Sequence, residues 1–190
     1  MRVFTLQRRE TLEGLARDGA IRNGGAIVDE DFAGAYGWMT GRMRERVGMP
    51  PEGISYPVWV WIRYHGRPFR PGRCPDDLDG MVLVEAEIPD GMVLASDFDE
   101  WHCVLNGFPH DSHKEAEEAW DRWIKQREDP DGPMPEDVRR LMEQSWEGIF
   151  HSDGDSVQGT VWEIRQEWIV SIRPLRQTML RKIRRSFRLQ

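Results

Sequence analysis

The residues best suited to chemistry gather between Met81 and Asn106, where two apolar segments precede a short polar and aromatic run. In that run Asp97 is followed by His102. An imidazole can act as a general acid or base near neutral pH, and nearby carboxylates favour its protonated form. At i+4 from Phe98, the same histidine can instead pack in a core and donate to a carbonyl. Both interpretations remain open, but we expect His102 to be partly exposed, because Trp101 can fill the buried stripe alone.

A second candidate is the aromatic run from Tyr56 to Tyr64. In a strand, Trp59, Trp61 and Arg63 share one face, while Val58, Val60 and Ile62 share the other. The tryptophan face could stack a nucleotide base or a nicotinamide ring, with Arg63 placed for a phosphate. The alternative is a strand packed on both sides within the core.

Three polar residues fall on segments that resemble strands, namely Gln7, Gln158 and Glu163. A carboxylate on a central strand is costly to bury without a partner. Glu163 is therefore either paired with a cation, such as Arg165 or one in the C-terminal segment, or catalytic. The candidate catalytic residues are then Asp97, His102 and Glu163.

Motifs with a known mechanism are absent from the sequence: we find no catalytic triad, Walker loop or dinucleotide fingerprint. Zinc-binding residue types occur at His102, Cys103, His110 and His113, but their spacing matches no standard zinc site. We therefore predict no metal, and the sequence identifies no cofactor.

Composition indicates one folded domain. The chain has 190 residues, is 39% hydrophobic and holds nine tryptophans, which is enough for one sizeable core. The N-terminal segment becomes charged where a signal peptide would be apolar, and no window approaches a membrane span. We expect a cytoplasmic protein, not associated with membranes, in which Cys74 and Cys103 are free thiols.

Charge is distributed unevenly along the chain. Residues 171–190 hold seven of the 26 Lys and Arg and no Asp or Glu, so all 33 acidic residues precede them. A basic arm can bind nucleic acid or an anionic surface. It can equally be a last helix whose cations balance the acidic body and its own C-terminal dipole.

The hydrophobic pattern predicts an α+β fold with a central, mostly antiparallel sheet flanked by helices. Strands are expected near residues 3–7, 56–64, 81–88, 92–95, 156–165 and 167–172, and helices near 9–19, 29–47, 98–106, 112–124 and 135–148. Ser112 with Glu115 predicts a capping box. The proline-rich and glycine-rich segment 65–80 is expected to be a ligand loop or lid. We expect one domain over residues 1–173 and a basic helix or tail over 174–190, opened by Pro174.

Several of these residues occur in an order that resembles the domain-of-unknown-function family 3841. The order comprises Gln7, Tyr36-Gly37-Trp38-Met39, Tyr56-Pro57-Val58-Trp59-Val60-Trp61, Ser96-Asp97-Phe98-Asp99-Glu100-Trp101-His102, Leu105-Asn106 and Gln158-Gly159-Thr160-Val161-Trp162-Glu163. The resemblance covers nearly the whole chain up to the basic segment. It implies a small bacterial protein of a single domain, and it implies no reaction.

A helix after the first strand, aromatic strands and a late-strand glutamate also resemble the ADP-ribosyltransferases at the level of fold. Gln7 stands where that resemblance leads us to expect Arg or His. We hypothesise a small-ligand or nucleotide-acting domain, which this resemblance would make transferase-like, whose cleft includes catalytic Asp97, His102 and Glu163. The candidate ligand-binding residues are Gln7, Tyr36, Trp38, Trp59, Trp61, Arg63, Asn106 and Gln158. The alternative is a binding or regulatory module for a protein or nucleic acid partner that uses the basic tail.

Overall fold

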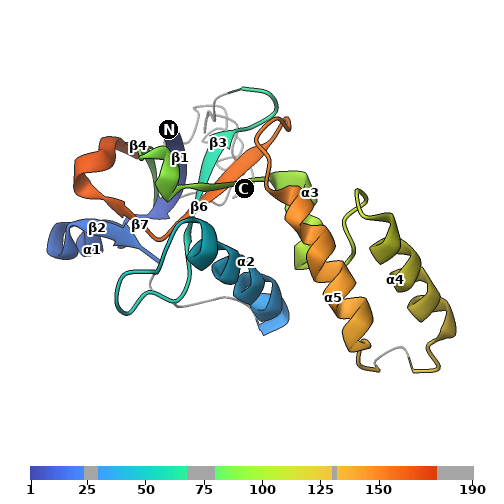
Figure 1. The fold of residues 1–190 in the computed structure, drawn as a ribbon. Coiled ribbons are helices and arrows are strands. Elements are labelled where there is room, and N and C mark those ends of the chain that lie inside the picture. Colours follow the sequence, from blue (N-terminus) through green and yellow to red (C-terminus); the bar gives the residue numbers. More distant parts are fainter. Residues whose placement is uncertain (24–29, 68–79, 130–131, 175–190) are drawn as a thin grey trace, which may run out of the picture.

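The structure is a computed structural model that describes residues 1–23, 30–67, 80–129 and 132–174 (Figure 1). Its strands are β1 (Arg2–Arg8), β2 (Ala20–Arg22), β3 (Val58–Arg63), β4 (Met81–Glu87), β5 (Leu94–Asp97), β6 (Val157–Val161), β7 (Glu163–Arg165) and β8 (Ile169–Pro174). Its α-helices are α1 (Thr11–Asp18), α2 (Ala33–Arg46), α3 (Phe98–Leu105), α4 (Lys114–Gln126) and α5 (Glu136–Ser145). Short 3-10 helices are η1 (Glu30–Phe32), η3 (Asp90–Met92), η4 (Trp146–Ile149) and η5 (Gln166–Trp168).

Six strands form one sheet in the order β5-β6-β3-β1-β4-β8, and every neighbouring pair is antiparallel. All six were predicted, because each combines apolar alternation with β-branched or aromatic residues. The fold is therefore α+β with an antiparallel central sheet, as expected.

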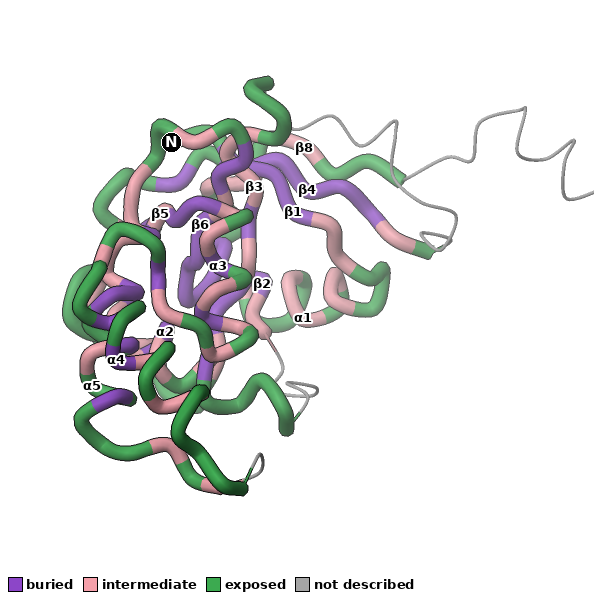
Figure 2. Tube along the Cα trace, turned by 90° about the vertical axis from the view of Figure 1, so that its right-hand side faces the viewer, coloured by how far each residue is buried: buried purple, intermediate pink, exposed green. Residues whose placement is uncertain are grey.

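The first face of this sheet is lined mainly by valines. Val58 and Val60 of β3 pack here with Val84 of β4, against Leu12 and Leu15 of α1. Ile21 of β2 and Ile164 of β7 close the same cluster, which we call the valine face. The buried residues of strands β1, β4 and β6 run through the centre of the molecule (Figure 2).

The second face of the sheet carries the large rings, and we call it the aromatic face. Trp59 packs with Trp101 of α3 and Met39 of α2, both buried, whereas Trp61 packs with Phe4 and Leu83 of the neighbouring strands. The alternation predicted for β3, with valines on one side and tryptophans on the other, is thus confirmed. Helices α4 and α5 lie side by side, away from the sheet (Figure 1).

Two local predictions were wrong. The single strand expected over 156–165 is divided at Trp162, whose indole N–H donates to the Gly48 carbonyl (2.8 Å), and β7 then pairs with the three-residue strand β2 instead. Helix α4 is capped by the His113 ring, which accepts from the Ala116 amide, and not by Ser112. Pro174 is the last residue of β8. Residues 68–79 of the expected ligand loop, and 175–190 of the expected tail, lie outside the described residues.

Gly159 is required by close packing on the valine face. A methyl group at this position would lie 2.6 Å from Val93 Cγ1 and 3.3 Å from Val60 Cγ2. Val60 has no exposed surface, so the core around it has little room to move.

We predict that Gly159→Ala lowers the free energy of unfolding by about 1–3 kcal/mol, because it overpacks the core. Gly14→Ala in α1 is the matched control: nothing lies within 4 Å of its added methyl group, and alanine is the better helix former by up to about 1 kcal/mol. Urea unfolding of both variants measures the difference. Equal stability of the two variants would contradict this packing.

Candidate functional site around helix α3

The start of helix α3 is fixed by Asp97. One carboxylate oxygen, Oδ1, accepts hydrogen bonds from the amides of Asp99 (2.9 Å) and Glu100 (3.0 Å) and so caps the helix. The other oxygen lies against Gly154, where an added Cβ would come within 1.8 Å of Oδ2. Asp97 is buried at the end of β5, so its position sets the direction in which α3 leaves the sheet.

Helix α3 presents three different sets of side chains. Trp101 and Val104 are buried in the core with α2. Phe98 and His102, four residues apart, stand together on a second side, with their rings edge to face at 4.9 Å. Glu100 points to a third side, toward two histidines. The helix therefore separates an aromatic surface from an acid and imidazole cluster.

On the aromatic surface, rings follow one another across α3 and β3. The Trp61 ring lies 4.9 Å from Phe98 and 5.0 Å from Tyr64, between centroids. Sheet register places Gln158 of β6 beside Trp61, and Ser96 of β5 beside Gln158. Arg63, at the end of β3, donates from Nη2 to the Ser152 carbonyl.

Beneath these rings lies a more buried aromatic group. Trp59 lies 5.1 Å from Trp101 and 6.2 Å from Tyr36. Burial raises the pKa of the Tyr36 hydroxyl, and the Trp59 indole N–H opposes that effect without forming a hydrogen bond of normal geometry. The hydroxyl of Ser96 is fully buried and has no hydrogen-bond partner among the residues that the structure describes.

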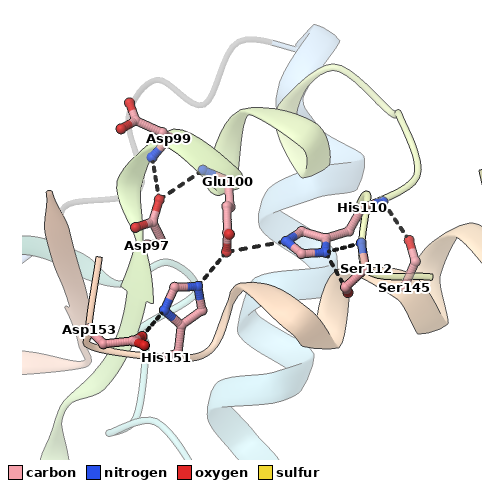
Figure 3. Close-up of polar contacts among 8 residues, drawn as sticks. All are labelled: Asp97, Asp99, Glu100, His110, Ser112, Ser145, His151 and Asp153. Carbon is pink, nitrogen blue, oxygen red and sulfur yellow. Dashed lines mark hydrogen bonds and ion pairs between the residues drawn. The ribbon is translucent and has the colours of Figure 1, made fainter. Parts of the chain in front are cut away.

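The other side of α3 carries a chain of hydrogen-bonded groups that joins four segments (Figure 3). Glu100 Oε2 lies 2.6 Å from His151 Nε2 and 3.2 Å from His110 Nε2, so one carboxylate oxygen contacts two imidazoles. His151 Nδ1 contacts Asp153 Oδ1 at 2.5 Å, and His110 Nδ1 contacts the Ser112 hydroxyl at 2.7 Å. The His110 amide donates to Ser145 of α5 (2.8 Å), which ties the chain to that helix.

Ser112, His110 and Glu100 have the order of groups used in nucleophilic catalysis: hydroxyl, imidazole, carboxylate. The space at the hydroxyl is occupied, however. A methyl group on Gly148 would lie 2.9 Å from both Ser112 Oγ and His110 Nδ1, so the backbone of η4 packs directly on them. The Ser112 amide also donates to Nδ1 (3.2 Å), which leaves Nε2 as the proton-bearing nitrogen that faces Glu100. We interpret this part of the chain as a structural link.

Of the residues predicted to share a site, the structure brings six close to α3 and the aromatic face: Tyr36, Trp59, Trp61, Arg63, His102 and Gln158. Asp97 adjoins them as the cap of α3, where its carboxylate is already occupied by amides. His102 is exposed and Trp101 is buried, as predicted.

Four predicted residues are not brought into this group. Trp38 stacks on Phe150 at 5.4 Å, on the far side of α2. Gln7 lies on the valine side of β1 and donates to Thr5 (2.8 Å). Asn106 is exposed and donates from its side chain to the His102 carbonyl (2.7 Å), at the end of α3. Glu163 lies on β7, outside the six-stranded sheet.

Glu163 has the ion-paired environment that was one of its two predicted alternatives. Its Oε2 accepts from Arg22 (2.8 Å) and its Oε1 from Arg165 (2.8 Å). Burial raises the pKa of the carboxyl group, but the hydrogen bonds from Arg165 and Arg22 outweigh it and hold the pKa below its usual value. A carboxylate held by two guanidinium groups is poorly placed to act as a base.

The pairing of Glu100 with His151 was not predicted from the sequence. Glu100 was noted only as a member of the Ser96–His102 run, and His151 falls in an irregular segment 51 residues away. Neither residue belongs to a periodic pattern, so the sequence contains no signal that joins them.

The family model for a domain of unknown function, DUF3841, matches residues 2–170. The chain belongs to this family. The match includes α3 and every strand of the sheet up to the second residue of β8, so the family and the fold described here coincide over nearly the whole chain. No curated protein matches the sequence.

The part of the chain that the structure describes contains no group of three or more His, Cys, Asp or Glu arranged to hold a metal ion. None of its helices has the length and apolar character that a bilayer crossing requires.

We predict that His102→Ala changes the free energy of unfolding by no more than about 0.5 kcal/mol, because the side chain is exposed. Trp101→Ala, the adjacent control on the buried side, should cost about 3–5 kcal/mol. Denaturant unfolding tests both. A loss of 2 kcal/mol or more in His102→Ala would identify that histidine as core packing and remove it from the candidate site.

We predict that Glu163→Gln destabilises the fold by about 1–3 kcal/mol at neutral pH, since two guanidinium groups lose their charged acceptor. The lowered pKa means that the carboxylate's contribution is present above the ordinary value of 4.5 and is lost as pH falls through the folded value. The difference in the free energy of unfolding between wild type and Glu163→Gln should therefore become smaller as the pH falls. Unfolding measured from neutral to acidic pH, with exposed Glu117→Gln as control, tests this; a gap that widens in acid would refute it.

Proposed function

We propose that this protein binds and acts on a small ligand with a flat ring, most suitably a nucleotide, at the aromatic face beside α3. One observation carries the proposal: the Trp61 ring contacts the rings of both Phe98 and Tyr64, Gln158 is the residue opposite Trp61 on β6, and Arg63 follows on β3 just beyond a β-bulge. Rings, an amide and a guanidinium group are the three kinds of side chain that recognise a base, its polar edge and a phosphate.

His102 is the group on this face best suited to move a proton. Its Nδ1 lies 3.0 Å from the Phe98 carbonyl, which can only accept, so Nδ1 carries the proton and Nε2 keeps a free lone pair. An exposed imidazole with a fixed tautomer is a suitable general base. In this proposal His102 is the catalytic candidate, in place of Glu163.

Transferase-like chemistry of the ADP-ribosyltransferase kind has less support than ligand binding. That resemblance depended on a late-strand glutamate, and Glu163 is held by Arg22 and Arg165. Gln158, which does lie in the sheet next to Trp61, has an amide that cannot serve as a base. We propose a cytoplasmic location, on the sequence argument alone.

Nucleotide binding can be tested by thermal shift and by tryptophan fluorescence with NAD, ATP, AMP and GMP. We expect at least one to raise the melting temperature, and Trp61→Ala to weaken its affinity about tenfold or more, since stacking contributes about 1–3 kcal/mol per base. Trp123→Ala on α4, where Trp123 packs with Trp120, is the control and should bind as wild type.

The alternative, a binding module that uses the basic tail, makes the opposite prediction. If no nucleotide stabilises the protein, while deletion of residues 175–190 abolishes capture of RNA or of a protein partner, the ligand-binding proposal fails. Wild-type affinity in Trp61→Ala would also overturn it.

A further inference from the structure

The segment between η4 and β6, residues 150–156, joins the two sides of α3. Its Asp155 carbonyl accepts from the Gly66 amide (2.7 Å), its Ser156 carbonyl accepts from the Phe98 amide (2.9 Å), and its Ser152 carbonyl accepts from Arg63. The 150–156 loop thus holds the first residue of α3, the backbone that follows β3, and the guanidinium group of Arg63 at the end of β3.

His151 fastens this loop to α3. Its Nε2 contacts Glu100 Oε2 at 2.6 Å and its Nδ1 contacts Asp153 Oδ1 at 2.5 Å (Figure 3). Ionised carboxylates only accept hydrogen bonds, so both contacts are satisfied when both ring nitrogens carry a proton. A neutral imidazole has one N–H and would leave a lone pair facing one of the two carboxylates. The geometry therefore fits the imidazolium form.

From this geometry we infer that His151 is a positioning residue for Arg63: protonated, it holds the 150–156 loop against α3, and nucleotide binding at the aromatic face weakens when it loses that proton. This inference rests on the proposed function, since it concerns the affinity of the same site. It assigns His151, Glu100 and Asp153 a role that the family match does not supply.

The charges around His151 favour the protonated form. Glu100 faces it from α3, Asp153 from its own loop, and Asp97 lies behind Gly154 at the end of β5. Two cations contact the loop: Arg63 of β3 at the Ser152 carbonyl, and Arg46 of α2 over the Phe150 ring. His110 shares Glu100 and, with its Nδ1 accepting from the Ser112 amide, presents a single N–H to that carboxylate.

The pKa of His151 changes in the direction that this arrangement requires. The hydrogen bond to Glu100 raises it, burial partly opposes that effect, and Asp153 raises it further, so it lies above the ordinary 6.5. Because this pKa is raised, the stabilisation that protonated His151 gives to the loop contact is fully present below about pH 6.5. It is lost as the pH rises through the pKa of His151 in the folded protein. The loop should therefore loosen on the alkaline side of neutrality.

Proton NMR of the full-length protein tests the first step without any ligand. We expect the His151 ring signals to titrate above pH 6.5, and the amide signals of Gly66, Phe98 and Ser156 to follow the same curve. In His151→Gln these amides should not titrate. His113→Gln, at the cap of α4, is the control and should leave the curve unchanged. Signals of α4 residues show whether each variant is folded.

The second step is nucleotide affinity between pH 6 and pH 9, measured with the nucleotide that gives the largest thermal shift. Wild-type affinity should fall by up to about tenfold per pH unit above the folded pKa of His151, and His151→Gln should bind with a nearly flat profile. Asp153→Asn should shift the wild-type curve to lower pH, because it removes one of the two carboxylates.

The outcomes separate the two proposals. Loop amides that follow His151 while no nucleotide binds would support the loop contact and overturn the proposed function. Nucleotide binding with loop amides that ignore His151, or with the same pH profile in His151→Gln and wild type, would overturn the inference and leave the function standing.

Discussion

The Asp97 carboxylate is the contact on which the rest of the site depends. By accepting two amides of the first turn of α3, it fixes where the helix begins, and by lying against Gly154 it fixes where the 150–156 loop passes. Rotating the helix by one residue would move each side chain on it by about 100°. Phe98 would then leave Trp61, and Glu100 would leave the histidines. One buried cap thus sets both the aromatic surface and the imidazole cluster.

Much of the fold follows from local sequence, because the strands of the six-stranded sheet carry clear alternation. Val58 and Trp59 already indicated opposite faces, and the structure places them in different clusters. Strand β2 was missed because three residues give no measurable period. The break at Trp162 was missed because its cause is a hydrogen bond to Gly48, which lies 114 residues earlier in the chain.

The site was less predictable than the fold, since its partners are distant in sequence. Arg165 was a natural partner for Glu163, two residues away, but Arg22 lies 141 residues away and is joined to it only by the pairing of β2 with β7. The exposure of His102 could be inferred, because neighbouring Trp101 had the larger apolar ring to bury. The link between Glu100 and His151 could not, because it depends on how one irregular loop is held.

The partners chosen for the carboxylates differ in a way that bears on function. Glu85 is held by Arg2 and Arg173, and Glu163 by Arg22 and Arg165, so their partners stay charged at any physiological pH. Glu100 contacts the imidazoles of His151 and His110 instead, and it raises the pKa of His151 above the ordinary 6.5. The arginine pairs hold the six-stranded sheet and the two-stranded sheet of β2 and β7, so these ion pairs do not change with physiological pH. The histidine pair holds the loop that carries the Arg63 contact, where a change of pH can act.

Thermodynamic reciprocity gives this arrangement a second consequence. If protonation of His151 strengthens nucleotide binding, then nucleotide binding must strengthen protonation of His151 by the same factor. A ligand stacked against Trp61 and Phe98 would hold the backbone amide of Phe98 in place, and with it the Ser156 carbonyl of the loop. The loop would then keep His151 between Glu100 and Asp153, the position that stabilises its proton. Ligand binding at a pH above the pKa of His151 in the free protein should therefore take up a proton. The protonation state of His151, on one side of α3, would then report whether a ligand is bound at the aromatic face on the other side.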